Sequence, residues 1–379
     1  MRAFHRALNG ILALVLSAAL LSVPAYAEGD EAPAGIIDEE QLNEMVAQYI
    51  EEKNLDPEKI SVGYCYTATG DTWLYNGDRW YYSASMYKVP LMMILAEREY
   101  NGELTQDSNL DGLTLARAEE SILTYSNNDF AHLMMHYIGT DRECRELYQQ
   151  YSDLPVDDYD PDFYDYSYFN ARFMTDVMKT LYFENERFPH IIDCLKPAQP
   201  GAYFRRDMGT EYEIAQKYGS YKEFNSTAGI VYTPNPYILV VMTKDLSIAG
   251  GENVIAQLCV KFRDYTLQLD SELEAYEQAQ AEAEAEALAE QLLREQEELE
   301  RRQAEEQAAA EAQPTPSVIP SAAPAQDEEP GEKSPVPVIA IAGGIGAVIV
   351  IAAVVLLLVR RRKKEPATSG GSRGYTPKH

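Results

Sequence analysis

The chain is short of positive charge. Its 379 residues include 32 lysines and arginines against 61 aspartates and glutamates, which gives a formal net charge of -29. Binding to nucleic acid requires basic side chains gathered on one face, where they meet the phosphates. This composition therefore argues against a nucleic-acid partner and leaves cationic or neutral partners. A large share of the surplus acidic residues lies within residues 271–312.

Residues that bind metals are also sparse. The chain has five histidines, and His132 and His136 lie four apart in a helical pattern. No glutamate stands between them as in an H-E-x-x-H motif, and no third ligand is evident. The sequence therefore predicts neither a metal site nor a cofactor.

Cysteine is scarce as well, with only four residues in the chain. All four fall within the segment expected to fold as a domain, and they allow three disulfide pairings. Buried apolar thiols are the alternative. The sequence leaves the disulfide state of these cysteines open: Cys65, Cys144, Cys194 and Cys259.

Long apolar runs are confined to the two ends. Residues 1–27 combine early basic residues, an apolar run and Ala25-Tyr26-Ala27, the pattern of a cleaved signal peptide. Residues 338–359 are apolar and glycine-rich, long enough to cross a hydrocarbon core of about 30 Å. Basic residues 360–364 follow and mark the cytoplasmic side. These patterns predict a type I, single-span protein of the cell membrane, with 360–379 as its cytoplasmic tail.

Composition divides the part expected outside the membrane into three segments. Residues 36–270 have the mixed composition of one folded domain. Residues 271–313 are rich in alanine, glutamate and glutamine and predict an acidic helical stalk. Its apolar seam is not sustained through heptads, which favours a solvated single helix over a coiled-coil dimer. Residues 314–337 are a proline-rich linker. Weak self-association through the stalk or the span stays open.

Within residues 36–270, strand patterns occur at both ends and helical patterns in the middle. This segregation predicts an α+β fold, in which both ends of the segment build a five-stranded antiparallel sheet with helices packed on it. Breaks are expected at Gly219-Ser220 and at Pro234-Asn235-Pro236. The expected strands are 61–66, 72–75, 212–216, 226–232 and 237–243. The expected helices are 86–97, 113–137 with a break at 126–128, 171–181 and 251–269.

Ser85-Met86-Tyr87-Lys88 places a hydroxyl and an amine on one face of a helix. Burial of Lys88 would lower its pKa and let it act as a base toward Ser85. Two further motifs follow: Ser126-Asn127-Asn128, and Lys217-Tyr218-Gly219-Ser220 on the first late strand. Taken alone, Ser126 and Asn128 are more typical of helix caps, and Lys217 is more typical of a solvated strand lysine.

Together and in this order, the three motifs resemble those of the class A β-lactamase and penicillin-binding family, S-x-x-K, S-D-N and K-T-G. The resemblance covers residues 36–269. It implies Ser85 as nucleophile, Lys88 as its base and Ser126 as the relay of a proton to the leaving nitrogen. It further implies that Asn128 and Lys217 bind substrate, and that an oxyanion is held by backbone N–H groups of Ser85 and Ser220, beside Gly219.

The chain departs from that family at two places. Tyr218 stands where the third motif has a small hydroxyl residue that meets a substrate carboxylate. The loop at 151–170 contains no glutamate, whereas class A enzymes have one there that activates the deacylating water. Aspartates are the available stand-ins, although most are expected to be solvated loop acids: Asp157, Asp158, Asp160, Asp162 and Asp165.

These features predict a membrane-anchored extracytoplasmic serine hydrolase that forms an acyl-enzyme on Ser85. The expected substrates are β-lactams or the D-alanyl-D-alanine ends of peptidoglycan stem peptides, with slow deacylation if no carboxylate replaces the loop glutamate. The alternative is a non-catalytic module that binds cell wall or ligand and retains the fold without turnover.

Overall fold

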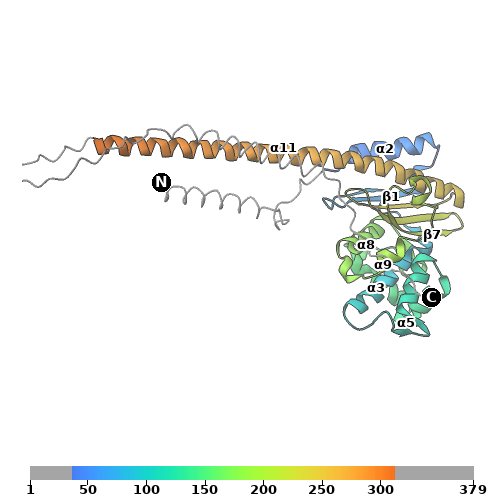
Figure 1. Cartoon of the computed structure of the whole chain (residues 1–379). Helices are drawn as coiled ribbons and strands as arrows, with labels where there is room; N and C mark the ends of the chain where they lie inside the picture. The colour runs from blue at the N-terminus through green and yellow to red at the C-terminus, as the bar shows by residue number, and fades with distance from the viewer. Residues whose placement is uncertain (1–35, 312–379) are drawn as a thin grey trace, which may run out of the picture. The chain divides into compact units, whose positions relative to one another are not determined.

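The structure is a computed structural model that describes residues 36–311 (Figure 1). The expected signal peptide (1–27), linker (314–337), membrane span (338–359) and tail (360–379) lie outside these residues. Among the described helices, none combines the length and the apolar character needed to cross a membrane.

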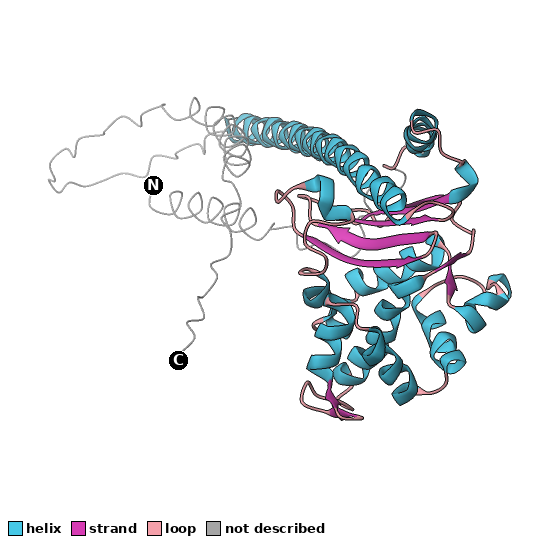
Figure 2. Ribbon diagram, turned by 90° about the vertical axis from the view of Figure 1, so that its right-hand side faces the viewer, coloured by secondary structure: helices cyan, strands magenta, loops and turns pink. Residues whose placement is uncertain are grey.

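One five-stranded antiparallel sheet is the centre of the fold. Its order is β2-β1-β9-β8-β7, so the early hairpin pairs with the last strand of the chain, as the sequence predicted. All but a few of its residues are buried, because helices cover both faces of the sheet (Figure 2). The strands are β1 (Ile60–Tyr66), β2 (Thr72–Tyr75), β7 (Ile214–Tyr221), β8 (Phe224–Val231) and β9 (Tyr237–Thr243).

The expected break at Gly219-Ser220 is wrong. Both residues lie inside β7, and the turn to β8 comes at Lys222, which has a φ of 51°. A glycine within a strand can mark a close approach of another backbone instead of a turn. Gly219 is such a case, because it lies against the backbone of Ser83 and Ser85.

Helices form two layers around the sheet. The middle of the chain folds into α3 (Lys88–Tyr100), α4 (Leu115–Glu119), a π-helical turn (Glu120–Thr124), α5 (Asn128–Ile138), α6 (Asp141–Tyr148), α7 (Pro161–Tyr166), α8 (Ala171–Phe183), α9 (Ile191–Leu195) and α10 (Phe204–Met208). The other layer contains α2 (Glu39–Glu52) and the start of α11 (Ile248–Glu311), and α10 packs in the same core through Phe204 and Met208. Short two-stranded pairs join β3 (Tyr81–Tyr82) to β6 (Tyr168–Phe169) and β4 (Asn109–Leu110) to β5 (Leu113–Thr114).

Each face of the sheet has its own hydrophobic core. One core joins the sheet to α3, α5 and α8, and the other joins it to α2 and α11. The four cysteines are free thiols, three of them buried and Cys194 partly exposed. Burial raises the pKa of each cysteine thiol, so these groups behave as apolar packing atoms.

The closing helix and the stalk helix, expected separately, are one continuous helix of 64 residues, α11. Its first part packs on the sheet through Val254, Leu258 and Phe262. The side chains from Glu274 to residue 309 are almost all exposed. Exposed i,i+4 pairs such as Arg294 with Glu290 support the helix there.

Gly63 on β1 offers a test of the packing between the sheet and α8. A Cβ at Gly63 would lie 2.0 Å from Oγ1 of Thr175. Gly63→Ala should therefore lower the free energy of unfolding by about 2 kcal/mol through overpacking. Urea unfolding followed by the fluorescence of Trp73 and Trp80 measures the change.

Gly250→Ala is the matched control. Gly250 lies in α11, and its Cβ would meet only the Ser247 hydroxyl at 3.1 Å and a Leu246 carbon at 3.8 Å. Alanine is a better helix former than glycine, so this variant should be as stable as the wild type or more so. Equal stability of the Gly63→Ala variant and the wild type would contradict the described packing.

Candidate active site

Ser85 lies in a 3-10 turn, Ala84–Tyr87, that leads directly into α3. The turn begins with Ala84 in the left-handed region, at a φ of 46°, which is uncommon for a residue with a Cβ. Met86 and Lys88 are buried while Ser85 stays partly exposed. The local backbone thus fixes the Ser85 hydroxyl at the surface above a buried amine.

Lys88 is the first residue of α3 and is fully buried. Its Nζ lies 3.1 Å from Ser85 Oγ, 2.7 Å from the Ser126 carbonyl oxygen, 3.2 Å from Ser126 Oγ and 2.6 Å from Asn128 Oδ1. Within the described residues, no carboxylate forms an ion pair with it. Burial lowers the pKa of Lys88 to about 8, so neutral amine is present near physiological pH.

Ser126 and Asn128 reach Lys88 because a different residue caps α5. Asn127 is the N-cap, and its side chain accepts a hydrogen bond from the Phe130 backbone at 2.9 Å. Ser126 precedes the cap in the left-handed region, at a φ of 57°. The helix-cap interpretation thus applies to Asn127, and the side chains on either side of it are directed to the buried amine.

Lys217 approaches the same hydroxyl from β7. Its Nζ donates to Ser126 Oγ at 2.9 Å and to the Tyr218 carbonyl at 3.2 Å. Lys217 is fully buried, so the solvated-lysine interpretation is wrong. Desolvation, with a smaller effect of Lys88, holds the pKa of Lys217 well below its usual value. The Ser126 hydroxyl therefore lies between two amines, within hydrogen-bonding distance of both.

Gly219 brings β7 against the 3-10 turn that contains Ser85. A Cβ there would lie 2.5 Å from the Ser83 carbonyl oxygen and 2.9 Å from the Ser85 backbone nitrogen. Only glycine allows two backbones to approach so closely. The next residue, Ser220, thus has its backbone beside the Ser85 turn, while its hydroxyl donates to Asn225 Oδ1 at 2.9 Å.

Tyr218 has a partner that sequence reasoning missed. Its ring stacks on the ring of Tyr203, with centroids 4.7 Å apart and an interplanar angle of 25°. Lys217 Nζ lies 4.4 Å from the centre of the Tyr218 ring. Tyr203 precedes α10 in an irregular segment, so no periodic signal could have connected it with the third motif.

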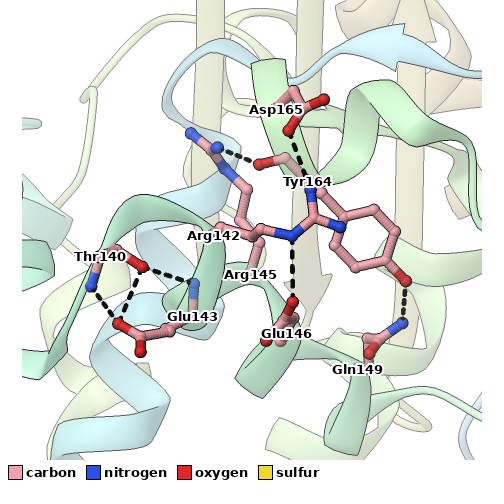
Figure 3. A network of polar contacts seen from close by, with 8 residues as sticks. All are labelled: Thr140, Arg142, Glu143, Arg145, Glu146, Gln149, Tyr164 and Asp165. Carbon is pink, nitrogen blue, oxygen red and sulfur yellow. Dashed lines mark hydrogen bonds and ion pairs between the residues drawn. The ribbon is translucent and has the colours of Figure 1, made fainter.

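The loop from 151 to 170 is a packed segment with its own helix, α7. Its rings Tyr159 and Phe163 pack on each other and on the ring of Trp80. Figure 3 shows two side chains that hold this loop, Arg142 on α6 and Gln149 just after it. Arg142 donates to Asp165 at 3.1 Å, and Gln149 donates to the Tyr164 hydroxyl at 2.6 Å.

None of the loop aspartates hydrogen-bonds to Ser85 or Lys88 within the described residues. Asp165 is held by Arg142, and Asp160 caps α7 by accepting from the Asp162 backbone at 2.8 Å. Asp157 and Asp158 are exposed. Where the loop returns to the site, it provides Ser167, whose hydroxyl lies 3.0 Å from the hydroxyl of Ser83.

Two other candidate sites remain separate from this arrangement. His132 and His136 belong to no cluster of metal ligands among the described residues. A cavity of about 650 Å³ includes none of the predicted site residues, being lined by Asp78, Trp80, Asp153, Leu154, Pro155, Asp158, Asn170, Arg172 and Asp176.

Comparisons with known proteins agree on one family. The sequence profile of the Beta-lactamase enzyme family matches residues 39–265. No curated protein matches the chain.

Solved structures show the same fold at low sequence identity. A β-lactamase from Xanthomonas campestris pv. campestris is 14% identical with a TM-score of 0.51, covering 59% of this chain and 97% of its own. One from Chitinophaga pinensis is 16% identical with a TM-score of 0.50, covering 60% and 98%. A variant of the class A β-lactamase of the last common ancestor of Gram-negative bacteria is 18% identical with a TM-score of 0.50, covering 61% and 98%. The family profile spans more than half of the chain and the fold is that of class A β-lactamases, so this chain belongs to the β-lactamase enzyme family.

Proposed function

We propose that the protein is a serine acyl-transfer enzyme with Ser85 as its nucleophile. The observation that supports this most directly is Lys88, a buried amine without a carboxylate partner among the described residues, 3.1 Å from Ser85 Oγ. A carboxylate beside Lys88 would favour its charged form and make it a poor base. With hydroxyl, carbonyl and amide oxygens as its partners, neutral Lys88 can accept the Ser85 proton.

The reaction would proceed in two steps. Ser85 Oγ attacks the substrate carbonyl carbon, its proton passes to Lys88 Nζ, and backbone N–H groups of Ser85 and Ser220 stabilise the oxyanion. The C–N bond then breaks as Ser126 donates its proton to the leaving nitrogen, and Ser126 recovers a proton from Lys88, 3.2 Å away. A water molecule later hydrolyses the ester, returning Ser85 and releasing a carboxylic acid.

The proposed substrates are β-lactams or the related D-alanyl-D-alanine ends of peptidoglycan stem peptides. Both present an amide carbonyl to a serine nucleophile, which is the chemistry that Ser85, Lys88 and Ser126 can perform. The expected signal peptide, membrane span and linker support a place outside the cell membrane, tethered near the cell wall.

A binding module without turnover is the second candidate. Two observations favour it: Tyr218 occupies the position of a small hydroxyl residue, and no described loop carboxylate contacts Ser85 or Lys88. The two candidates differ in whether Ser85 forms a covalent bond.

Covalent labelling separates these candidates. A fluorescent penicillin at high concentration should label the protein, and Ser85→Ala should abolish the label because the attacking oxygen is removed. Ser271→Ala changes an exposed serine of α11 and should retain full labelling. If β-lactams leave the wild type unlabelled, the binding module is favoured.

Intact mass measured over time tests deacylation. Because the loop carboxylates are held elsewhere or exposed, the mass of the penicilloyl adduct should persist for minutes to hours after free penicillin is removed. A return to the unmodified mass within seconds would show that another group activates the water efficiently.

The pKa of Lys88 predicts the pH dependence of acylation. Below about pH 8 the amine is mostly protonated, so the acylation rate should rise about tenfold per pH unit and level off above pH 8. Lys88→Arg should lose acylation at every pH, since a guanidinium cannot act as a base in this range. A flat wild-type profile from pH 6 to 9 would contradict the assignment of Lys88 as the base.

A further inference from the structure

We infer that Tyr218 makes this site react faster with substrates whose group next to the reacting amide nitrogen is neutral, such as an ester or an amide, than with the free carboxylates of penicillins and D-alanyl-D-alanine ends. The inference rests on the proposed acylation of Ser85 and narrows the class of substrate. It begins from Lys217, the amine that the third motif places beside Ser126.

The amine of Lys217 is engaged with groups of this chain. It donates to Ser126 Oγ and to the Tyr218 carbonyl. The centre of the Tyr218 ring lies 4.4 Å from Nζ. Lys217 is also fully buried, so a substrate carboxylate reaches it only if the groups around it shift, the Tyr218 ring among them.

The Tyr218 ring is held where it lies. It stacks on Tyr203, which is itself 6% exposed, and it packs against the core on the α2 and α11 side of the sheet. An offset pair of this kind is worth about 1 kcal/mol beyond the burial of its area. Moving the ring would therefore break a stacking contact as well as a cation–π contact.

Ser220 carries the other hydroxyl of the third motif, and this hydroxyl is directed to β8. Ser220 donates its hydroxyl proton to Asn225 Oδ1 at 2.9 Å. Asn225 is fully buried on β8, so this bond is shielded from water.

Other basic side chains around β7 are also engaged. Arg205 on α10 donates to the backbone carbonyls of Lys196, Ala198 and Ile214. Lys196 forms ion pairs with Asp193 and Glu213. Arg206 pairs with Asp207. Lys222, in the turn after β7, lies over the ring of Tyr221.

A matched pair of probes tests the inference: benzylpenicillin and its methyl ester, which share the β-lactam and the acyl side chain and differ in the carboxylate. The wild type should be acylated about tenfold faster by the ester, because the free carboxylate would be desolvated beside the Tyr218 ring without gaining a partner. Tyr218→Thr uncovers Lys217 and supplies a hydroxyl, so the ratio of ester to acid rates should fall at least tenfold. Intact mass measures both rates.

Two further variants complete the experiment. Tyr218→Phe keeps the ring and should keep the wild-type ratio. Tyr221→Thr changes an exposed tyrosine on the same strand and should alter both rates equally, leaving the ratio unchanged. Faster acylation by the free acid in the wild type would overturn the inference while leaving acylation of Ser85 intact. If neither probe acylates the wild type, the proposed function itself fails.

Discussion

Two lysines, Lys88 and Lys217, lie fully buried on either side of one hydroxyl, and within the described residues neither has a carboxylate partner. A buried charge without a counter-charge is costly, so each amine is pushed toward its neutral form. The cost is limited by oxygen acceptors from separate parts of the chain: the turn with Ser85, the segment Ser126–Asn128 and β7. The surrounding fold has to hold those acceptors in place. The left-handed residues Ala84 and Ser126, and the glycine at 219, are the backbone features that do so.

The same buried pair connects the catalytic proposal with substrate selection. Lys88 faces Ser85 and has the lowered pKa of a base, whereas Lys217 faces Ser126 and the Tyr218 ring. The Tyr218 ring, stacked on Tyr203, lies beside this second lysine. The loop from 151 to 170 differs in a similar way, because its carboxylates face Arg142, a helix N-terminus or solvent, and its interior is aromatic. Neither departure removes the contact between Ser85 and Lys88.

Sequence patterns were most informative where they were periodic or local. The strands β1, β2 and β9 and the helix α8 were predicted closely. The strands are short runs bounded by turn residues, and α8 repeats its apolar residues at helical spacing. The end of β7 was predicted wrongly, because a glycine followed by serine gives the same local signal for a turn and for a backbone contact. The helix α7 was missed, since six residues within an acidic, aromatic loop have no detectable period.

The sequence by itself determined the three motifs, their order and their elements, and the absence of a glutamate from the loop, because these are properties of residue identity and spacing. Only the tertiary structure decided which side chains meet. Residues 88, 126 and 217 are far apart in the chain, and their contacts depend on how α3, the Ser126 loop and β7 pack. The contact between the rings of Tyr203 and Tyr218 likewise depends on tertiary packing. Whether Tyr218 covers Lys217 or turns away from it depends on that stacking contact, which no spacing in the sequence records.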